Sequence, residues 1–167
     1  MEAILPEFFQ HNLWANLRLL GACAGLTEAQ LGATVPGTFG PLGATLVHLV
    51  AAEESYLARL ARAARPDRAW AEGPFPGVAA LRERARRSGE ALVATARRET
   101  ASRVLRGTWR GEPYALPVAI VLIQAINHAT EHRAHVATIL SQLGIVPPDL
   151  DGWAYGEAMD TASASAP

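Results

Sequence analysis

The sequence is poor in cysteine, contains no lysine and carries almost no excess charge of either sign. Cys23 is the single cysteine in 167 residues, which excludes an intramolecular disulfide and a CxxC zinc clasp. All 15 basic residues are arginine, and the formal net charge is −1 at pH 7. A chain without a basic field has no general attraction for nucleic acid or for an acidic membrane surface. We therefore expect neither as a partner.

Long hydrophobic runs are missing as well. The longest apolar stretch, Pro117 to Ile126, is interrupted by a glutamine, whereas a membrane-spanning helix needs about 20 apolar residues. The first 14 residues lack the basic start and the long apolar core of a secretory signal peptide. We therefore expect a soluble cytoplasmic protein. Its length fits a single domain over residues 1–160, followed by a flexible tail at 161–167.

Glycine and proline residues divide the chain into apolar segments with the spacing of amphipathic helices. Long helices are predicted at residues 7–20, 42–63, 77–101 and 117–143. Between and after them we expect Gly/Pro-rich loops at 32–41 and 65–76, a short extended excursion or irregular hairpin at 103–117, and a short helix near 149–160. This pattern predicts an all-α fold: a four-helix bundle with a long connection and a short extended excursion before the last long helix. An irregular all-α packing of the same helices is the alternative.

The histidines concentrate in the last long helix, within the segment NHATEHRAHV. At about 100° of rotation per residue, His128, His132 and His135 fall in one narrow arc of that helix. Either neighbouring pair can place two imidazoles on one metal ion, but the three histidines of this helix cannot all bind the same ion. With a rise of about 1.5 Å per residue, His128 and His135 lie too far apart to share an ion bound at roughly 2 Å. At least one ligand must come from another element.

His48 is the best candidate for that ligand. It lies in the middle of the apolar segment GATLVHLVAAEESYL, and its neighbours on the same helical face are nearly all small. Small side chains leave room beside the imidazole, which favours a metal ion and a bound molecule over tight packing. We therefore predict a pocket formed by Ala44, Ala51, Ala52 and Ser55. A solitary histidine on an apolar face is more often a core residue. Here two apolar helices both carry histidines, and this coincidence favours metal ligation.

Glu131 is the acidic residue closest to the predicted ligands in the helical arc, about 60° from His128. It is a candidate for a hydrogen-bond acceptor that supports a ligand, or for a general base. A surface carboxylate that pairs with an arginine is an equally good interpretation. The segment differs from the HExxH motif of zinc proteases, because alanine follows the first histidine.

Four segments together resemble the DinB-like family of metalloenzymes, damage-inducible helical bundles that are unrelated to the DNA polymerase sharing the name. These segments are NLWANLRLL, LVHLVAAEESYL, NHATEHRAHVATILSQLG and PPDLDGWAY. The resemblance implies a divalent metal site with one histidine from the second long helix and an HxxxH pair from the fourth. These correspond to His48, His128 and His132. Relatives commonly have glutamine at the position of His135, so we interpret His135 as a residue that supports the ligands or the structure.

Three histidine ligands leave coordination positions open, whereas structural zinc sites are usually closed by four protein ligands. Open coordination makes the ion a Lewis acid that lowers the pKa of a bound water or thiol. Zinc and nickel are both reasonable ions for three imidazoles, with iron, cobalt and manganese as further candidates.

The resemblance also implies an activity. Some relatives are metal-dependent transferases or isomerases that use a low-molecular-weight thiol such as bacillithiol or mycothiol, and relatives are often homodimers. We therefore expect a homodimeric thiol S-transferase or isomerase that acts on a small-molecule substrate. A metal-dependent hydrolase and a non-catalytic metal-binding or stress-response sensor module are the alternatives.

Overall fold

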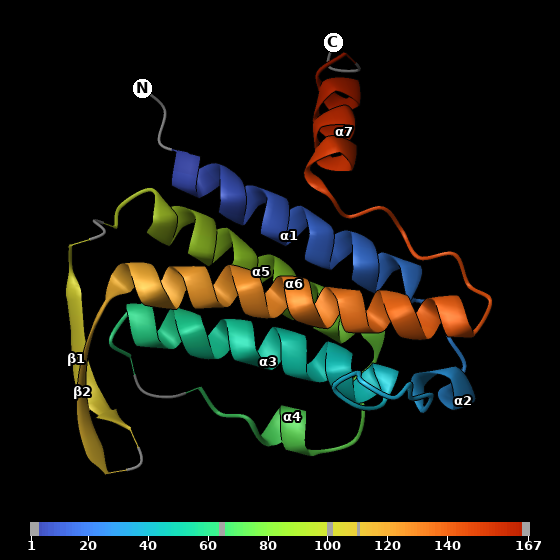
Figure 1. Ribbon diagram of the computed structural model, residues 1–167, viewed down its shortest axis with the longest axis horizontal. Helices are drawn as coiled ribbons and strands as arrows, with labels where there is room; N and C mark the ends of the chain where they lie inside the picture. The colour runs from blue at the N-terminus through green and yellow to red at the C-terminus, as the bar shows by residue number, and fades with distance from the viewer. Residues whose placement is uncertain (1–3, 64–65, 100–101, 110, 165–167) are drawn as a thin grey trace.

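The computed structural model describes residues 4–63, 66–99, 102–109 and 111–164, and most of them are helical (Figure 1). The four long helices are α1 (Ile4–Ala22), α3 (Leu42–Leu60), α5 (Val78–Ala96) and α6 (Val118–Gln142). Shorter helices are α2 (Glu28–Leu31), α4 (Ala69–Glu72) and α7 (Gly152–Ala164). The predominantly helical class predicted from the sequence is confirmed, with a small sheet added.

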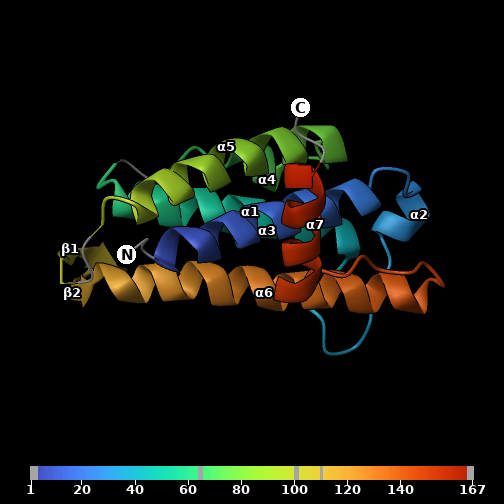
Figure 2. The same cartoon turned by 90° about the horizontal axis from the view of Figure 1, so that it is seen from above.

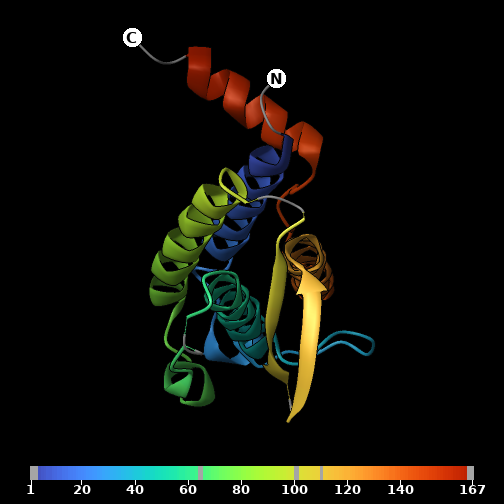
Figure 3. The same cartoon turned by 90° about the vertical axis from the view of Figure 1, so that its left-hand side faces the viewer.

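The four long helices pack side by side. α1 contacts α5 and α6, and α3 contacts the same two helices. Seen from above, α5 and α6 lie at opposite edges of the molecule (Figure 2), and the end view in Figure 3 shows the same grouping. α3 and α6 each begin directly after a proline, Pro41 and Pro117. Proline suits the start of a helix because its φ is fixed near the helical value, and because the N–H that it lacks would have no partner within the first turn. α1 and α5 approach closely at Gly89, where an added Cβ would lie 2.6 Å from Leu13 Cδ1.

The core consists of two apolar clusters separated by a polar layer. One cluster contains Leu19, Leu20, Cys23, Leu42, Leu46, Val50, Leu81, Ala85, Val136, Ile139 and Leu140. The other, nearer the small sheet, contains Phe9, Leu60, Leu92, Val93, Ala96, Leu105, Val118, Val121, Leu122 and Ala125. Along each long helix, buried polar residues fall between these two sets. We call them the polar layer: Asn12, Asn16, Glu53, Ser88 and Arg133.

The polar layer joins all four long helices through a single network. The Glu53 carboxylate accepts hydrogen bonds from the side-chain amides of Asn12 and Asn16, at 3.1 and 3.0 Å, and from the Ser88 hydroxyl. Arg133 donates to the amide oxygens of the same two asparagines, at 2.6 and 2.8 Å. The two amides therefore bridge a buried carboxylate and a buried guanidinium. Burial raises the pKa of Glu53 to about 7, although its hydrogen bonds and Arg133 act in the opposite direction.

The excursion predicted at 103–117 is a regular antiparallel hairpin. Strands β1 (Val104–Trp109) and β2 (Glu112–Pro117) pair from Val104 with Pro117 to Trp109 with Glu112. The hairpin lies across one end of the long helices (Figures 1 and 3).

Several predicted boundaries need correction. The loop predicted at 65–76 contains the one-turn helix α4, and α2 was not predicted. α3 and α5 end a few residues before the predicted 63 and 101, and residues 64–65 and 100–101 lie outside the described part of the chain. α7 projects away from the long helices and extends to Ala164 (Figure 1). It therefore includes the first four residues of the predicted tail, whose last three are not described. No helix in the described ranges is both long and apolar enough to cross a membrane.

Candidate metal centre

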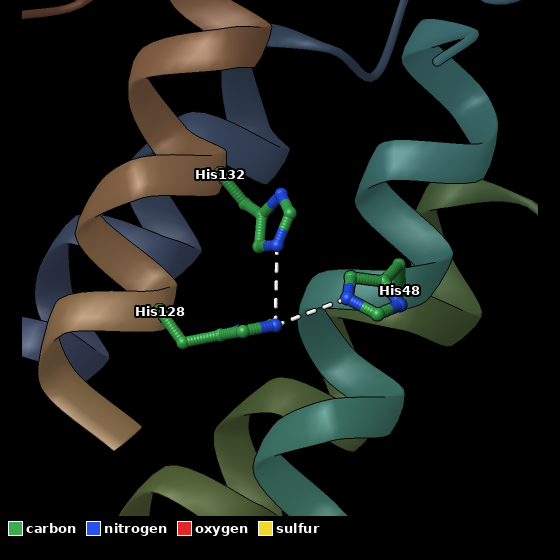
Figure 4. A group of neighbouring side chains, drawn as sticks. All are labelled: His48, His128 and His132. Carbon is green, nitrogen blue, oxygen red and sulfur yellow. Dashed lines mark hydrogen bonds between the residues drawn. The ribbon is translucent and has the colours of Figure 1, made fainter. Parts of the chain in front are cut away.

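The candidate centre lies between α3 and α6, which pack against each other. His48 comes from α3, and His128 and His132 come from successive turns of α6 (Figure 4). The Nε2 atom of His128 is 3.0 Å from that of His48 and 3.1 Å from that of His132. One ligand atom from each ring lies within 4.8 Å of the other two. The structure thus brings together the three histidines predicted as ligands.

Hydrogen bonding alone cannot satisfy this arrangement. A neutral imidazole nitrogen carries either one proton or one lone pair. The Nε2 atom of His128 can therefore form a full hydrogen bond with one of its two partners, and the other short N···N approach is left uncompensated. A cation between the nitrogens makes every approach favourable. Ligands bound at about 2.0–2.1 Å with tetrahedral angles lie roughly 3.3 Å apart, close to the two separations of 3.0 and 3.1 Å that His128 makes. The three side chains fit a divalent transition metal ion.

The electrostatics of the cluster keep the imidazoles neutral. Burial lowers the pKa of all three histidines, and their mutual proximity adds to this effect for His48 and His128. The pKa of His128 falls to about 4. The charge of Arg68 also lowers the pKa of His48. Since metals bind the unprotonated ring, the cluster is ready to accept an ion at neutral pH.

His135 lies behind the cluster. Its Nδ1 atom is 3.4 Å from Nδ1 of His132, on the side of the ring opposite the Nε2 that faces the other histidines. A proton on Nδ1 of His132 would point at His135, and such an interaction fixes the tautomer of a metal-binding histidine. His135 also lowers the pKa of His132, whereas Glu131 raises it. Glu131 itself is exposed on α6.

Two cavities border the histidine cluster, the larger at His48 and His128 and the smaller at His48 alone. The larger, of about 790 Å³, is lined by His48, Ala52, Ser55, Tyr56, Ala58, Arg59, Ala63, Pro66, Arg68, Thr108, Tyr114 and His128. The smaller, of about 430 Å³, is lined by Phe39, Ala44, Val47, His48, Ala51, Arg68, Ala71, Glu72, Gly73 and Phe75. The four small residues predicted to form one pocket are divided: Ala52 and Ser55 face the larger cavity, and Ala44 and Ala51 the smaller. Glu131 lines neither.

Phe39 and Arg68 are among the site residues that the sequence did not predict. The ring of Phe39 stacks on His48, with centroids 4.2 Å apart and planes inclined by 21°, and meets His132 edge-on at 5.0 Å. Arg68 lines both cavities. Both lie in Gly/Pro-rich connections that carry no periodic signal. The available hint is the segment PGTFGPLG, in which one aromatic residue stands between glycines just before the helix of His48.

Comparison with known proteins finds a matching family model and a crystal structure of similar fold. A family model described as the DinB family matches residues 1–162. A crystal structure of a DinB-like protein from Bacillus cereus ATCC 10987, at 2.01 Å resolution, is similar with a TM-score of 0.66. The two chains are 19% identical, and the match covers 87% of this chain and 94% of that chain, so the likeness concerns the fold alone. No curated protein shows significant sequence similarity to this chain.

Proposed function

The chain belongs to the DinB family, and from this membership and its histidine cluster we propose that it is a divalent-metal-dependent enzyme that transfers a low-molecular-weight thiol to an electrophile. One observation carries the proposal: the Nε2 atoms of His48, His128 and His132 converge beside a cavity of about 790 Å³. A purely structural metal site has no need of such a space.

The ligands are His48, His128 and His132, and the ion is zinc or nickel, with iron, cobalt and manganese as further candidates. When bound, the ion supplies a Lewis acid that lowers the pKa of a thiol or water. His135 orients the ring of His132 from behind. Three protein ligands leave room for a small molecule at the centre.

The chain's other residues bind the reactants and handle the proton. Ala52 and Ser55 keep the cavity open next to His48, and Tyr56 packs edge-on against His128 with ring centroids 5.7 Å apart. In the transfer step a C–S bond forms, the leaving group departs with its electron pair, and the thiol proton passes to water, or through water to Glu131, which lines neither cavity. Glu131 is exposed and already acts on His132 electrostatically, so it suits a proton acceptor in contact with solvent.

The test combines metal loading with a change of cavity volume. Zinc- or nickel-loaded protein is assayed against a panel of electrophiles with and without bacillithiol or mycothiol. Ala52→Leu places a bulky side chain one helical turn from His48 in the cavity wall, so turnover should fall about tenfold or more while metal content stays constant. Ala80→Leu, on the exposed side of α5, is the matched control and should change neither.

Other outcomes point to other functions. Turnover that needs no thiol indicates a metal-dependent hydrolase. Stoichiometric metal without any turnover indicates a metal-binding or sensor module. Unchanged activity in Ala52→Leu contradicts the placement of the substrate in the larger cavity.

Two further features of the family belong to the proposal. We take the four long helices as a four-helix bundle. We also propose that two copies associate through helices as a symmetric homodimer, because α6 exposes Ile120 and Ile123 on its outer face, at 52% and 54%.

A further inference from the structure

The wall of the larger cavity is positively charged. Arg59 and Arg68 both line it, and none of the described residues in its lining is acidic. A cavity wall with two guanidinium groups and no carboxylate attracts an anion.

Arg68 is the arginine more closely coupled to the histidine cluster. It lies half-buried in the connection between α3 and α5, directly before α4, which passes alongside α3 (Figure 1). Its charge lowers the pKa of His48. Among the ion pairs formed by described residues, none involves Arg68, although Glu72 shares the lining of the smaller cavity with it. Arg68 thus lines both cavities and forms no ion pair with a described carboxylate.

Arg59 packs over an aromatic ring. Its guanidinium carbon lies 5.3 Å from the ring centroid of Tyr114, which also lines the larger cavity. Tyr56 and Thr108 add hydroxyl groups to the same wall, whereas the Ser55 hydroxyl donates to the backbone oxygen of Ala51 at 2.9 Å. The cavity therefore offers cationic and neutral hydrogen-bond donors close to the histidines.

The charge of the centre strengthens this preference. Three neutral imidazoles contribute no negative charge, so a divalent ion held by them keeps its two positive charges. Arg68, which forms no ion pair with a described carboxylate, adds another positive charge beside it. Glu131 is exposed and outside the cavity, where solvent weakens its effect. Charges in a partly enclosed site are screened less than at the surface, so an anionic molecule is favoured there.

We infer that Arg68, with Arg59 beside it, binds a carboxylate group of the substrate and directs the substrate's reactive end at the three-histidine centre. The inference rests on the proposed function and narrows its substrate class to small carboxylate-bearing molecules. A planar guanidinium without a carboxylate partner matches the two oxygens of a carboxylate and can bind both at once.

Calorimetry with two thiols of equal length tests this assignment. The probes are 3-mercaptopropionate, which carries a carboxylate, and 3-mercapto-1-propanol, which is neutral. Zinc-loaded protein should bind the carboxylate probe about tenfold or more tightly than the alcohol. Arg68→Gln should abolish that preference and leave the affinity for the alcohol unchanged. Arg68→Lys should retain part of it, because an ammonium keeps the charge but loses the planar fork.

Arg82→Gln is the matched control, since Arg82 is exposed on α5 and lines neither cavity. It removes the same charge and should preserve the preference. Equal binding of the two thiols to the wild type, or a preference that survives Arg68→Gln, overturns the assignment while the proposed function stands.

A further pair of results distinguishes failure of the proposed function from failure of the carboxylate assignment to Arg68. If the protein takes no zinc, or if neither thiol binds, the proposed function fails. Succinate binding to the zinc-free protein then decides the role of Arg68. Binding that Arg68→Gln weakens about tenfold supports the carboxylate site, and binding that the variant leaves intact, or no binding at all, overturns it.

Discussion

At the scale of single residues, the direction of each imidazole decides which histidines can share an ion. His128 presents Nε2 to both His48 and His132, at 3.0 and 3.1 Å. His135 instead approaches His132 from its Nδ1 side, at 3.4 Å. The i,i+4 pair therefore faces α3, and the i,i+3 pair does not. This geometry favours His128 and His132 as the two ligands from α6.

Replacement of each histidine should affect metal content unequally. His48→Ala, His128→Ala and His132→Ala each remove one of three ligands and should eliminate most of the bound transition metal. His135→Ala removes only a group that orients His132, so we expect near-stoichiometric metal with an affinity lowered about 10- to 100-fold. Elemental analysis of the purified variants, followed by competition with a chelator, measures both quantities. Metal lost from His135→Ala but kept by His128→Ala would shift the ligand pair and refute the assignment.

A site residue could be predicted where its position depends only on the helix that carries it. The arc that contains His128 and His132 is a property of one helix and can be read from sequence spacing. His48 stood out because small residues surround it on its own helix. Phe39 and Arg68 could not be placed in this way. Their positions at the site depend on how two irregular connections fold back against α3, and this depends on the tertiary structure.

At the scale of elements, the polar layer sets the register of the long helices. Asn12 and Asn16 lie on successive turns of α1 and bridge Glu53 of α3 to Arg133 of α6. If one of these helices slid by one turn, the buried Glu53 carboxyl group or the buried Arg133 guanidinium would lose its hydrogen bonds. Such a loss is costly in a dry interior. Arg133 directly follows His132, so the same network holds that part of α6 in place.

The raised pKa of Glu53 predicts how the free energy of unfolding depends on pH. Its carboxyl group has a pKa of about 7 in the folded chain and an ordinary value near 4.3 when unfolded. The folded state therefore binds more protons between these values, and the free energy of unfolding should decrease as pH rises from about 4.3 to 7. Glu53→Gln cannot titrate and should lack this contribution, which we expect to be about 1–3 kcal/mol.

Denaturant unfolding of both proteins in the presence of a chelator, at several pH values, measures the effect. The buried histidines contribute with the opposite sign, because their lowered pKa values favour the folded state at higher pH. They are present in both proteins, so the difference between wild type and variant isolates Glu53. A difference that does not change with pH would show that the carboxyl group titrates normally.

The long elements were predictable and the short ones were not, for a physical reason. α1, α3, α5 and α6 contain enough turns for their apolar spacing to emerge from the sequence. α2 and α4 each span one turn, in which no period can be recognised. The polar layer could not be predicted from the sequence, because Glu53 and Arg133 are far apart along the chain. On its own helix, each looks like an ordinary surface charge.

At the scale of the whole molecule, the outer face of α6 predicts association. Ile120 and Ile123 are about half exposed on neighbouring positions of that face. If two copies pair there, light scattering should give a mass that moves from monomer to dimer with rising concentration. Ile123→Glu should shift the equilibrium toward the monomer, because a buried unpaired charge opposes association. A monomer mass that is independent of concentration contradicts the dimer.

Metal binding should stabilise the entire fold, because the ligands connect two helices that are distant in sequence. His48 and His128 are 80 residues apart and approach only when α3 and α6 pack together. The complete three-histidine site therefore exists in the folded state alone, and the ion shifts the unfolding equilibrium by mass action. At a free zinc concentration of 100 times the dissociation constant, the gain is about 2.7 kcal/mol. For a chain of this length, that corresponds to a rise in Tm of roughly 5–10 °C. His48→Ala keeps the HxxxH pair, which an unfolded chain can also present, so its Tm should rise by a small fraction of this amount. Differential scanning calorimetry with zinc or with a chelator measures the shift. An equal rise in His48→Ala would mean that the ion does not join α3 to α6, and the three-ligand centre would have to be abandoned.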